Sequence, residues 1–155
     1  PPDAPAAESP PATFRERLET ASEVWRLRAD LARQRLFDRV QPEPDQAARF
    51  DVLMEAMNLR LGAAIDDWAA RIAAADEVTP AMGVRMMHEI TGVLALTYDE
   101  LDRTLPPAWQ ANDDGSFELV TFIDPEVAMP LIAVEDTLRA SRPARRGPFG
   151  PPPRP

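Results

Sequence analysis

The sequence has no cysteine and no lysine, and it has a single histidine among its 155 residues. Without cysteine the chain can form no disulfide, no zinc–thiolate site and no thiol nucleophile. Without lysine it can form no Schiff base and no lysine-based phosphate loop. The one histidine, His88, leaves few general bases for catalysis near neutral pH. We therefore expect no catalytic residues, no cofactor and no enzymatic activity.

Long apolar runs are also missing, since no run approaches the roughly 20 residues that a membrane-spanning helix needs. We expect no transmembrane segment within this chain. The sequence starts at proline and continues "PPDAPAAESPPA", a composition common in spacers beyond a membrane anchor. A cleaved signal peptide or a trimmed anchor helix would both leave such a start. We therefore predict a location in the periplasm or envelope of a bacterium, with the cytoplasm as the alternative.

Proline is abundant, at 18 residues, against a usual share of about 5%. The prolines crowd positions 1–11 and 143–155, which indicates disordered or polyproline-like ends around a folded middle. We predict a Pro/Ala-rich flexible linker at 1–12, a helical domain at 13–140 and a Pro/Arg-rich disordered tail at 141–155.

The net charge is −9, and residues 41–140 carry six arginines against nineteen acidic residues. An acidic folded domain repels phosphates, so a nucleic acid is not expected as its partner. A protein partner or self-association remains as the expected kind of binding.

Three long segments have helical patterns. The first, 13–40, opens with a capping box in which Thr13 and Glu16 bond each other's backbone amides. Its apolar residues Phe14, Leu18, Trp25, Leu31 and Phe37 lie roughly on one side. This helix packs along one edge of the domain or projects to pair with another copy.

The second segment, 45–75, has the clearest period, with apolar residues at steps of three and four. They are Phe50, Leu53, Met57, Leu61, Ala64, Trp68 and Ile72, with Asp45 expected as the N-cap. The third, 80–105, follows the cap Thr79 and buries Met87, Ile90, Leu94, Leu101 and Leu105. Because few residues connect these two segments, we predict antiparallel neighbours.

The C-terminal part is harder to assign. Residues 116–123 have strand-like composition but no partner strand, so we expect a short helix capped by Ser116 or an extended segment. A final helix begins near Asp124 and is broken or kinked at Pro130, which lacks an amide hydrogen. The predicted fold is all-α, a small bundle of three long helices plus a broken C-terminal helix.

A metal site at "MMHE" would use Met82, Met86 and His88, because thioethers and imidazole suit Cu(I). His88, however, lies about 200° around the helix from Met86. The neighbouring acids of pairs such as Asp66 and Asp67 also diverge by about 100°. We therefore predict no metal site, with core methionines and solvated carboxylates as the interpretation.

Four aromatic residues, Tyr98, Trp109, Phe117 and Phe122, gather near one end of the predicted bundle. Aromatic side chains anchor many interfaces, so these four are the candidate binding residues. The alternative is that they close the core beneath the adjacent loop. The tail "GPFGPPPRP" resembles a polyproline ligand, or is inert.

The sequence favours a non-catalytic helical interaction or structural module in a bacterial envelope. The alternatives are a periplasmic stress- or metal-responsive helical protein and a small carboxylate-dependent hydrolase. A stoichiometric metal site that depends on His88 would favour the second, and a deep pocket with two converging carboxylates would favour the third.

Overall fold

A computed structural model of the chain describes residues 12–107, 109–111 and 117–140. These residues form helices and no strand, so the predicted all-α fold is confirmed. The elements are α1 (Phe14–Val40), α2 (Pro44–Ala74), α3 (Pro80–Thr104), the 3-10 helices η1 (Leu119–Phe122) and η2 (Pro125–Val134), and α4 (Glu135–Ala140). The predicted linker, apart from residue 12, and the predicted tail lie outside the described residues.

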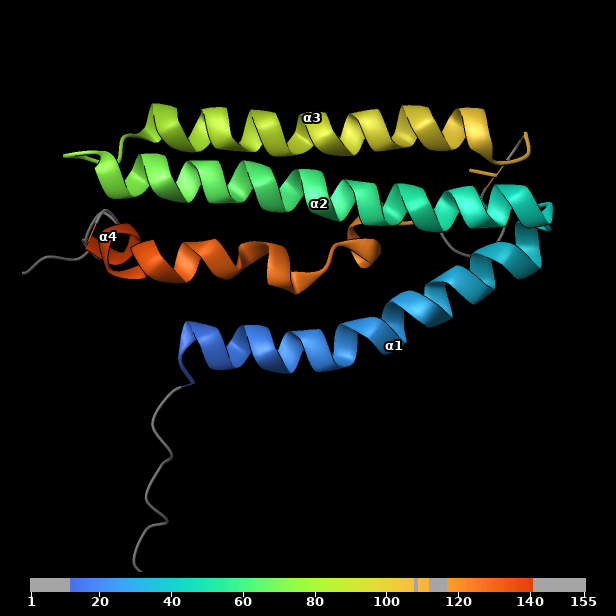
Figure 1. The fold of residues 1–155 in the computed structure, drawn as a ribbon, viewed down its shortest axis with the longest axis horizontal. Coiled ribbons are helices and arrows are strands. Elements are labelled where there is room, and N and C mark those ends of the chain that lie inside the picture. Colours follow the sequence, from blue (N-terminus) through green and yellow to red (C-terminus); the bar gives the residue numbers. More distant parts are fainter. Residues whose placement is uncertain (1–11, 108, 112–116, 141–155) are drawn as a thin grey trace, which may run out of the picture.

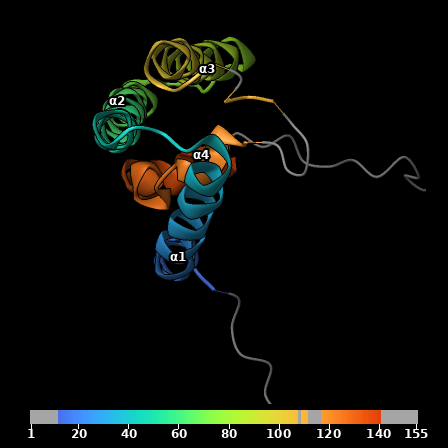
Figure 2. The same cartoon turned by 90° about the vertical axis from the view of Figure 1, so that its right-hand side faces the viewer.

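The elements lie side by side in a curved row, in the order α3, α2, then η2 with α4, then α1 (Figures 1 and 2). Helix α2 packs against α3 on one side and η2 on the other, whereas α1 packs against η2 and η1. One consequence is that α1 lies at the edge of the row. The possibility that α1 projects away from the domain is therefore wrong.

Helix α1 begins where the sequence predicts. The Thr13 amide donates to Glu16 Oε2 at 2.6 Å, and the Glu16 amide donates to Thr13 Oγ1 at 3.2 Å. The helix ends at Gln41, whose φ of 52° is left-handed and turns the chain toward α2. Between these ends α1 is visibly bent (Figure 1).

Helix α2 begins two residues earlier than its expected cap implies, because the N-cap is Glu43 and Pro44 is the first helical residue. The Glu43 amide donates to Gln46 Oε1 at 2.9 Å. Asp45, which the sequence predicts as the cap, lies in the first helical turn instead. Proline suits that turn because its missing amide hydrogen would have no partner there, so the start moves ahead of Asp45.

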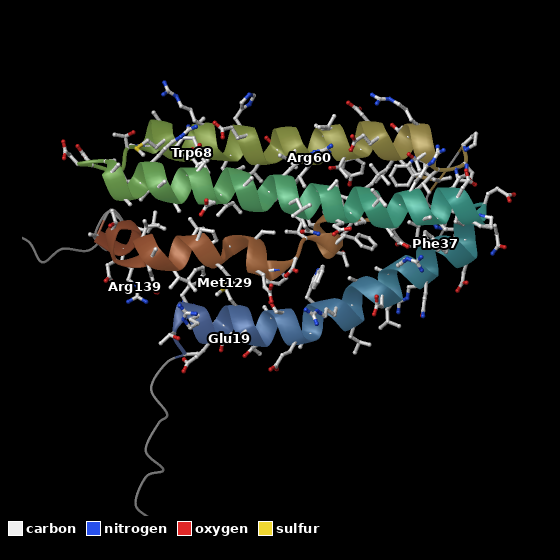
Figure 3. The ribbon with its side chains drawn as sticks, in the orientation of Figure 1. Glu19, Phe37, Arg60, Trp68, Met129 and Arg139 are labelled. Carbon is white, nitrogen blue, oxygen red and sulfur yellow. The ribbon has the colours of Figure 1, made fainter. Side chains whose placement is uncertain are left out.

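Helices α2 and α3 are antiparallel neighbours, as predicted, and Arg60 and Trp68 of α2 lie along α3 (Figure 3). Arg60 Nη1 donates to Glu100 Oε2 at 2.9 Å, and Trp68 Nε1 donates to Glu89 Oε2 at 2.8 Å. Thr79 caps α3 by accepting from the Met82 amide. The contacts of Arg60 and Trp68 thus link α2 to α3 at two levels along their shared face.

The core follows the predicted stripe of α2. Its buried residues include Phe50, Met54, Met57, Leu61, Ile65, Trp68 and Ile72. On α3 the prediction of Met87 as core is wrong, because this side chain is 54% exposed while Met86 is half-buried. Among the described elements, α2 is the long helix that packs against α3. The buried face of α3 is therefore narrower than the apolar face that the sequence predicts.

The segment before the final helix wraps across α2. Residues 119–122 form the 3-10 helix η1, and Ser116, its predicted cap, lies outside the described residues. Asn58 of α2 holds the end of η1, because Asn58 Nδ2 donates to Phe122 O at 2.9 Å and the Asp124 amide donates to Asn58 Oδ1 at 2.7 Å.

The final helix is broken, as predicted. It begins at Pro125 with Asp124 Oδ1 accepting from the Glu126 amide at 2.9 Å. The chain stays in the narrower 3-10 form past Pro130 and becomes α-helical only at Glu135. Proline removes one helical hydrogen bond and crowds the preceding turn, which accounts for the change of form.

Candidate interaction surface

The four predicted binding residues do come together, as part of an aromatic cluster. Ring centroids lie 5.0 Å apart for Trp109 and Phe117, 5.5 Å for Phe117 and Phe122, and 6.3 Å for Tyr98 and Trp109. Trp109 is only 3% exposed and Phe122 only 5%, whereas Tyr98 and Phe117 are half-buried. Trp109 and Phe122 therefore have little surface to offer a partner, and the binding role predicted for the four stays a prediction.

The cluster joins the main core through Phe50 of α2, whose ring centroid lies 5.4 Å from that of Phe122. Trp109 Nε1 and Gln110 Nε2 each donate to Asp102 Oδ1 at 2.8 Å. Asp102 thus satisfies the polar edge of a buried indole, as Glu89 does for Trp68. The acidic residues Glu89 and Asp102 of α3 are therefore explained by their hydrogen bonds to buried tryptophans.

His88 is exposed on α3, on the polar side that its spacing predicts. Met82 and Met86 are half-buried along the face of α3 that meets α2. Within the described ranges no group of three or more His, Cys, Asp or Glu residues could hold a metal ion.

Helix α1 has apolar residues on two opposite faces. The inner face contacts the domain through Trp25, whose Nε1 donates to Thr121 O at 3.1 Å, and through the buried Leu36. The outer face carries Val24, Leu27 and Leu31, which are 43%, 64% and 44% exposed. Leu36 follows Leu27 by nine residues, which is about half a turn around the helix. We call Val24, Leu27 and Leu31 the outer stripe.

The outer stripe corrects one sequence prediction. Leu31 was expected beside Trp25 and Phe37 on the packed side of this helix, and it lies on the exposed side instead. Because α1 has leucines on both faces, their spacing along the sequence does not indicate which face is buried. Only the neighbours of α1 decide which leucine is buried.

Charged side chains flank the outer stripe with opposite signs. Glu23 and Asp30 lie about 40–60° to one side of Leu27, and Arg28 and Arg35 lie about 80–100° to the other. All four are exposed. The ion pairs found among the described residues use none of these four side chains. These side chains can therefore face a partner, although Asp30 also lies close enough to Arg33 to help raise the pKa of that guanidinium.

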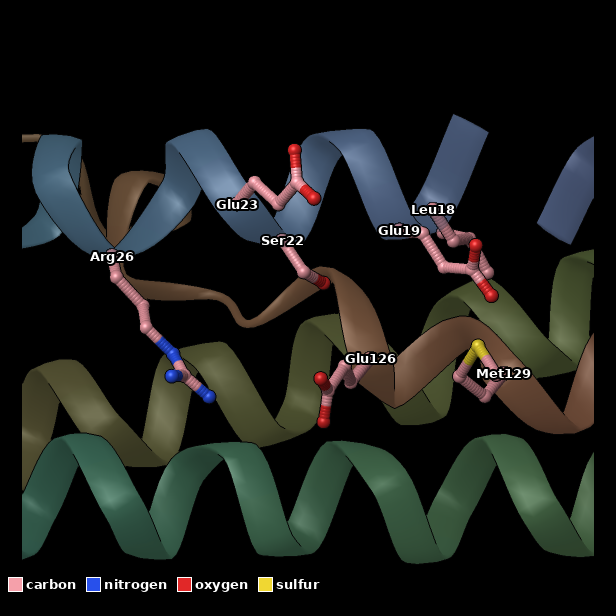
Figure 4. A pocket seen from close by; sticks show the side chains of 7 residues that line it. All are labelled: Leu18, Glu19, Ser22, Glu23, Arg26, Glu126 and Met129. Atoms are coloured by element: carbon pink, nitrogen blue, oxygen red, sulfur yellow. The ribbon is translucent and has the colours of Figure 1, made fainter. Parts of the chain in front are cut away.

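A groove of ≈ 620 Å³ lies on the acidic side of α1, between α1 and η2 (Figures 3 and 4). Its lining residues are Leu18, Glu19, Ser22, Glu23, Arg26, Glu126 and Met129. The three carboxylates point in different directions in Figure 4, so this groove directs no carboxylate pair at one point. Ser22 Oγ is buried here without a hydrogen-bond partner among the described residues.

A second groove, of ≈ 900 Å³, lies on the arginine side, between α1 and η1. Its apolar lining includes Leu31 of the outer stripe and the buried Leu36 and Phe122. Its charged lining is mainly arginine: Arg28, Arg35 and Arg39, with Asp38 and Glu118. Arg39 Nη1 donates to Ala111 O at 2.5 Å. The outer stripe is thus a ridge between an acidic groove and a basic groove, and this surface of α1 is the candidate site.

Comparison of the chain with family models, with curated protein sequences and with solved structures found no match. None of the described helices combines the length and the apolar character that a bilayer crossing requires. The candidate site therefore rests on the geometry of this chain alone.

Proposed function

We propose that the protein is a non-catalytic helical interaction module that binds a helical segment of a protein partner along the outer stripe of α1. The observation that carries the proposal is the exposure of Val24, Leu27 and Leu31 in one continuous row. Such a row, at steps of three and four residues, is the usual anchor for a second helix. Its charged flanks would orient the partner.

The outer stripe is not needed to complete the core. The two clusters of buried residues and their half-buried neighbours include none of its three residues. Burying apolar surface is favourable by about 25 cal/mol per Å², and a partner helix would gain this free energy without changing the fold. Contiguous exposed apolar surface with a polar rim is typical of a binding site.

Helix α1 is also held in place before any partner arrives. Its capping box orders its first turn, and the ion pair of Arg33 Nε with Asp51 Oδ1 at 2.6 Å ties it to α2. Trp25 ties it to η1. A helix that is already formed loses little conformational entropy on binding, which favours affinity.

The stress- or metal-responsive and hydrolase alternatives have no equivalent observation in their favour. The envelope location rests on the composition of 1–12 and stays a prediction from the sequence. Interaction through α1 does not depend on that location.

Photo-crosslinking tests the proposal. A benzophenone amino acid at position 27 is expected to form a covalent adduct with a protein in a lysate of the source cells. Leu59 of α2 is the matched control, because it is an exposed leucine, 69% against 64%, that lies apart from the outer stripe.

Absence of any adduct at position 27, or equal adducts at positions 27 and 59, would contradict the proposed function. An adduct with either another protein or a second copy of the chain agrees with it. Purified protein alone separates these two kinds of partner, as described below.

A further inference from the structure

We propose that the partner of the outer stripe is a second copy of this chain, with the two α1 helices parallel about a twofold axis. The inference rests on the proposed function, since it names the partner of the same surface. Two observations support it independently: the residue types of the stripe and the arrangement of the charges beside it.

The residue types fit a two-stranded seam. The steps from Val24 to Leu27 and from Leu27 to Leu31 are three and four residues, which gives the heptad positions a, d and a. Val24 at a with Leu27 at d is the combination that favours two parallel strands, whereas Leu31 at the second a position is not β-branched. The next d positions on either side are Thr20 and Gln34, both exposed and polar, so the apolar seam extends for about two turns.

The flanking charges specify the parallel direction. In this register Glu23 and Asp30 occupy g positions, and Arg28 and Arg35 occupy e positions. A g residue of one parallel helix meets the e residue five positions later in its partner. Glu23 would therefore meet Arg28 of the second copy, and Asp30 would meet Arg35. The twofold axis repeats both pairs.

The antiparallel direction would be unfavourable. There g positions meet g positions and e positions meet e positions, so acids would face acids and arginines would face arginines. Like charges at close range destabilise a helix pair by amounts similar to what opposite charges contribute. The charge pattern thus selects one of the two directions.

The fold leaves room for such a pair. Helix α1 lies at the edge of the row (Figures 1 and 2), and its outer stripe is exposed, although Leu31 also lines the groove between α1 and η1. Two copies can therefore meet along α1 with their domains on opposite sides, in a self-complementary interface.

The association should be weak. A seam of two turns buries less than the roughly 1,200 Å² of the smaller specific interfaces, so we expect a dissociation constant on the order of 100 µM. Sedimentation velocity of the purified protein, from about 10 µM to about 1 mM, is expected to change from monomer to dimer. A monomer throughout this range would overturn the inference.

The variant Leu27→Glu is expected to weaken the association at least about tenfold, because a charge at d would enter the seam. Since Leu27 is exposed, this variant should keep the melting temperature of the dilute protein. Leu59→Glu, at the equally exposed site on α2, is the matched control and should dimerise normally. Equal weakening by both substitutions would overturn the inference.

Charge reversal tests the pairs at the flanks. Glu23→Arg and Arg28→Glu, each alone, are expected to weaken the association about threefold or more. The double variant E23R/R28E restores opposite charges across the parallel seam and should dimerise like the natural chain. Failure of the double variant to recover would overturn the predicted register.

Disulfide trapping determines the direction, and the chain has no other cysteine to interfere. In a parallel pair Thr20→Cys faces itself, so this variant should form a disulfide dimer under mild oxidation. In an antiparallel pair a positions face d positions, so with Leu27 opposite Leu31 position 20 faces position 38. A disulfide between Thr20→Cys and Asp38→Cys in a mixture would overturn the parallel arrangement.

The two proposals can fail separately. If the purified chain stays monomeric while position 27 crosslinks to a different protein, self-association is wrong and the interaction module stands. If position 27 crosslinks to nothing in the lysate and the purified chain stays monomeric, both proposals are wrong.

Discussion

Helices α1 and α2 are similar in length, yet their surroundings make them different kinds of helix. Helix α2 has α3 on one side and η2 on the other, so a wide band of its apolar residues is buried. Helix α1 meets η1 and η2 on one face only, and Leu36 is its only buried residue. Composition adds to this difference, because α1 has seven arginines and three alanines whereas α2 has three arginines and nine alanines. Helix α2 thus builds the core, and α1 leaves part of its apolar surface exposed.

The largest effect is expected on the stability of the domain, for a variant in the buried face of α2. Leu61 is 1% exposed in the main core, and Leu61→Asp should destabilise the domain by about 4 kcal/mol or more, because it buries a charge without a partner. Denaturant unfolding followed by circular dichroism measures this change.

The control for Leu61 lies two residues earlier on the same helix. Leu59 is 69% exposed, so Leu59→Asp should change the free energy of unfolding by no more than about 0.5 kcal/mol. Similar losses for the two variants would mean that the buried and exposed faces of α2 are assigned incorrectly.

The periodic pattern predicted the core of α2 well because two neighbours bury nearly every residue in it. The same method failed for Met87 and Leu31, where one neighbour buries only part of an apolar pattern. The sequence identified the aromatic cluster, and the alternative that it closes the core agrees with the burial of Trp109 and Phe122. It gave no sign that Val24 and Leu27 would be exposed, since exposure depends on where α1 docks.

The second largest effect is expected on the free energy of unfolding, for variants on the inner and outer faces of α1. Trp25→Ala should destabilise the domain by about 2 kcal/mol, because it removes apolar contacts and the hydrogen bond to Thr121 O. Leu27→Ala, on the outer face, should change the free energy of unfolding by about 0.5 kcal/mol or less.

The free energies of unfolding of both variants should be measured at a protein concentration well below the expected dissociation constant, where self-association contributes nothing to stability. A loss for Leu27→Ala as large as that for Trp25→Ala would show that the outer stripe packs within the chain. The distinction between the two faces would then be wrong.

The smallest expected effect compares the side chains that accept from the N-cap amide in the two helices, of which the one in α1 is ionisable and the one in α2 is neutral. Each helix starts with a backbone amide bonded to the side chain three residues later, Glu16 in α1 and Gln46 in α2. Hydrogen bonds from the backbone and side chain of Thr13 lower the pKa of Glu16 from its ordinary value of 4.5. The amide of Gln46 does not titrate in this range.

Because the pKa of Glu16 is lower in the folded chain than in the unfolded chain, its cap stabilises α1 fully above pH 4.5. That stabilisation is lost as the pH falls through the lowered pKa, where the unfolded state binds more protons. Amide hydrogen exchange should therefore show the first turn of α1 opening in acid earlier than the first turn of α2. In Glu16→Gln the capping group no longer titrates, so the early opening of the α1 turn in acid should disappear. If the natural chain and this variant had the same pH profile, protonation of Glu16 would not control the start of α1.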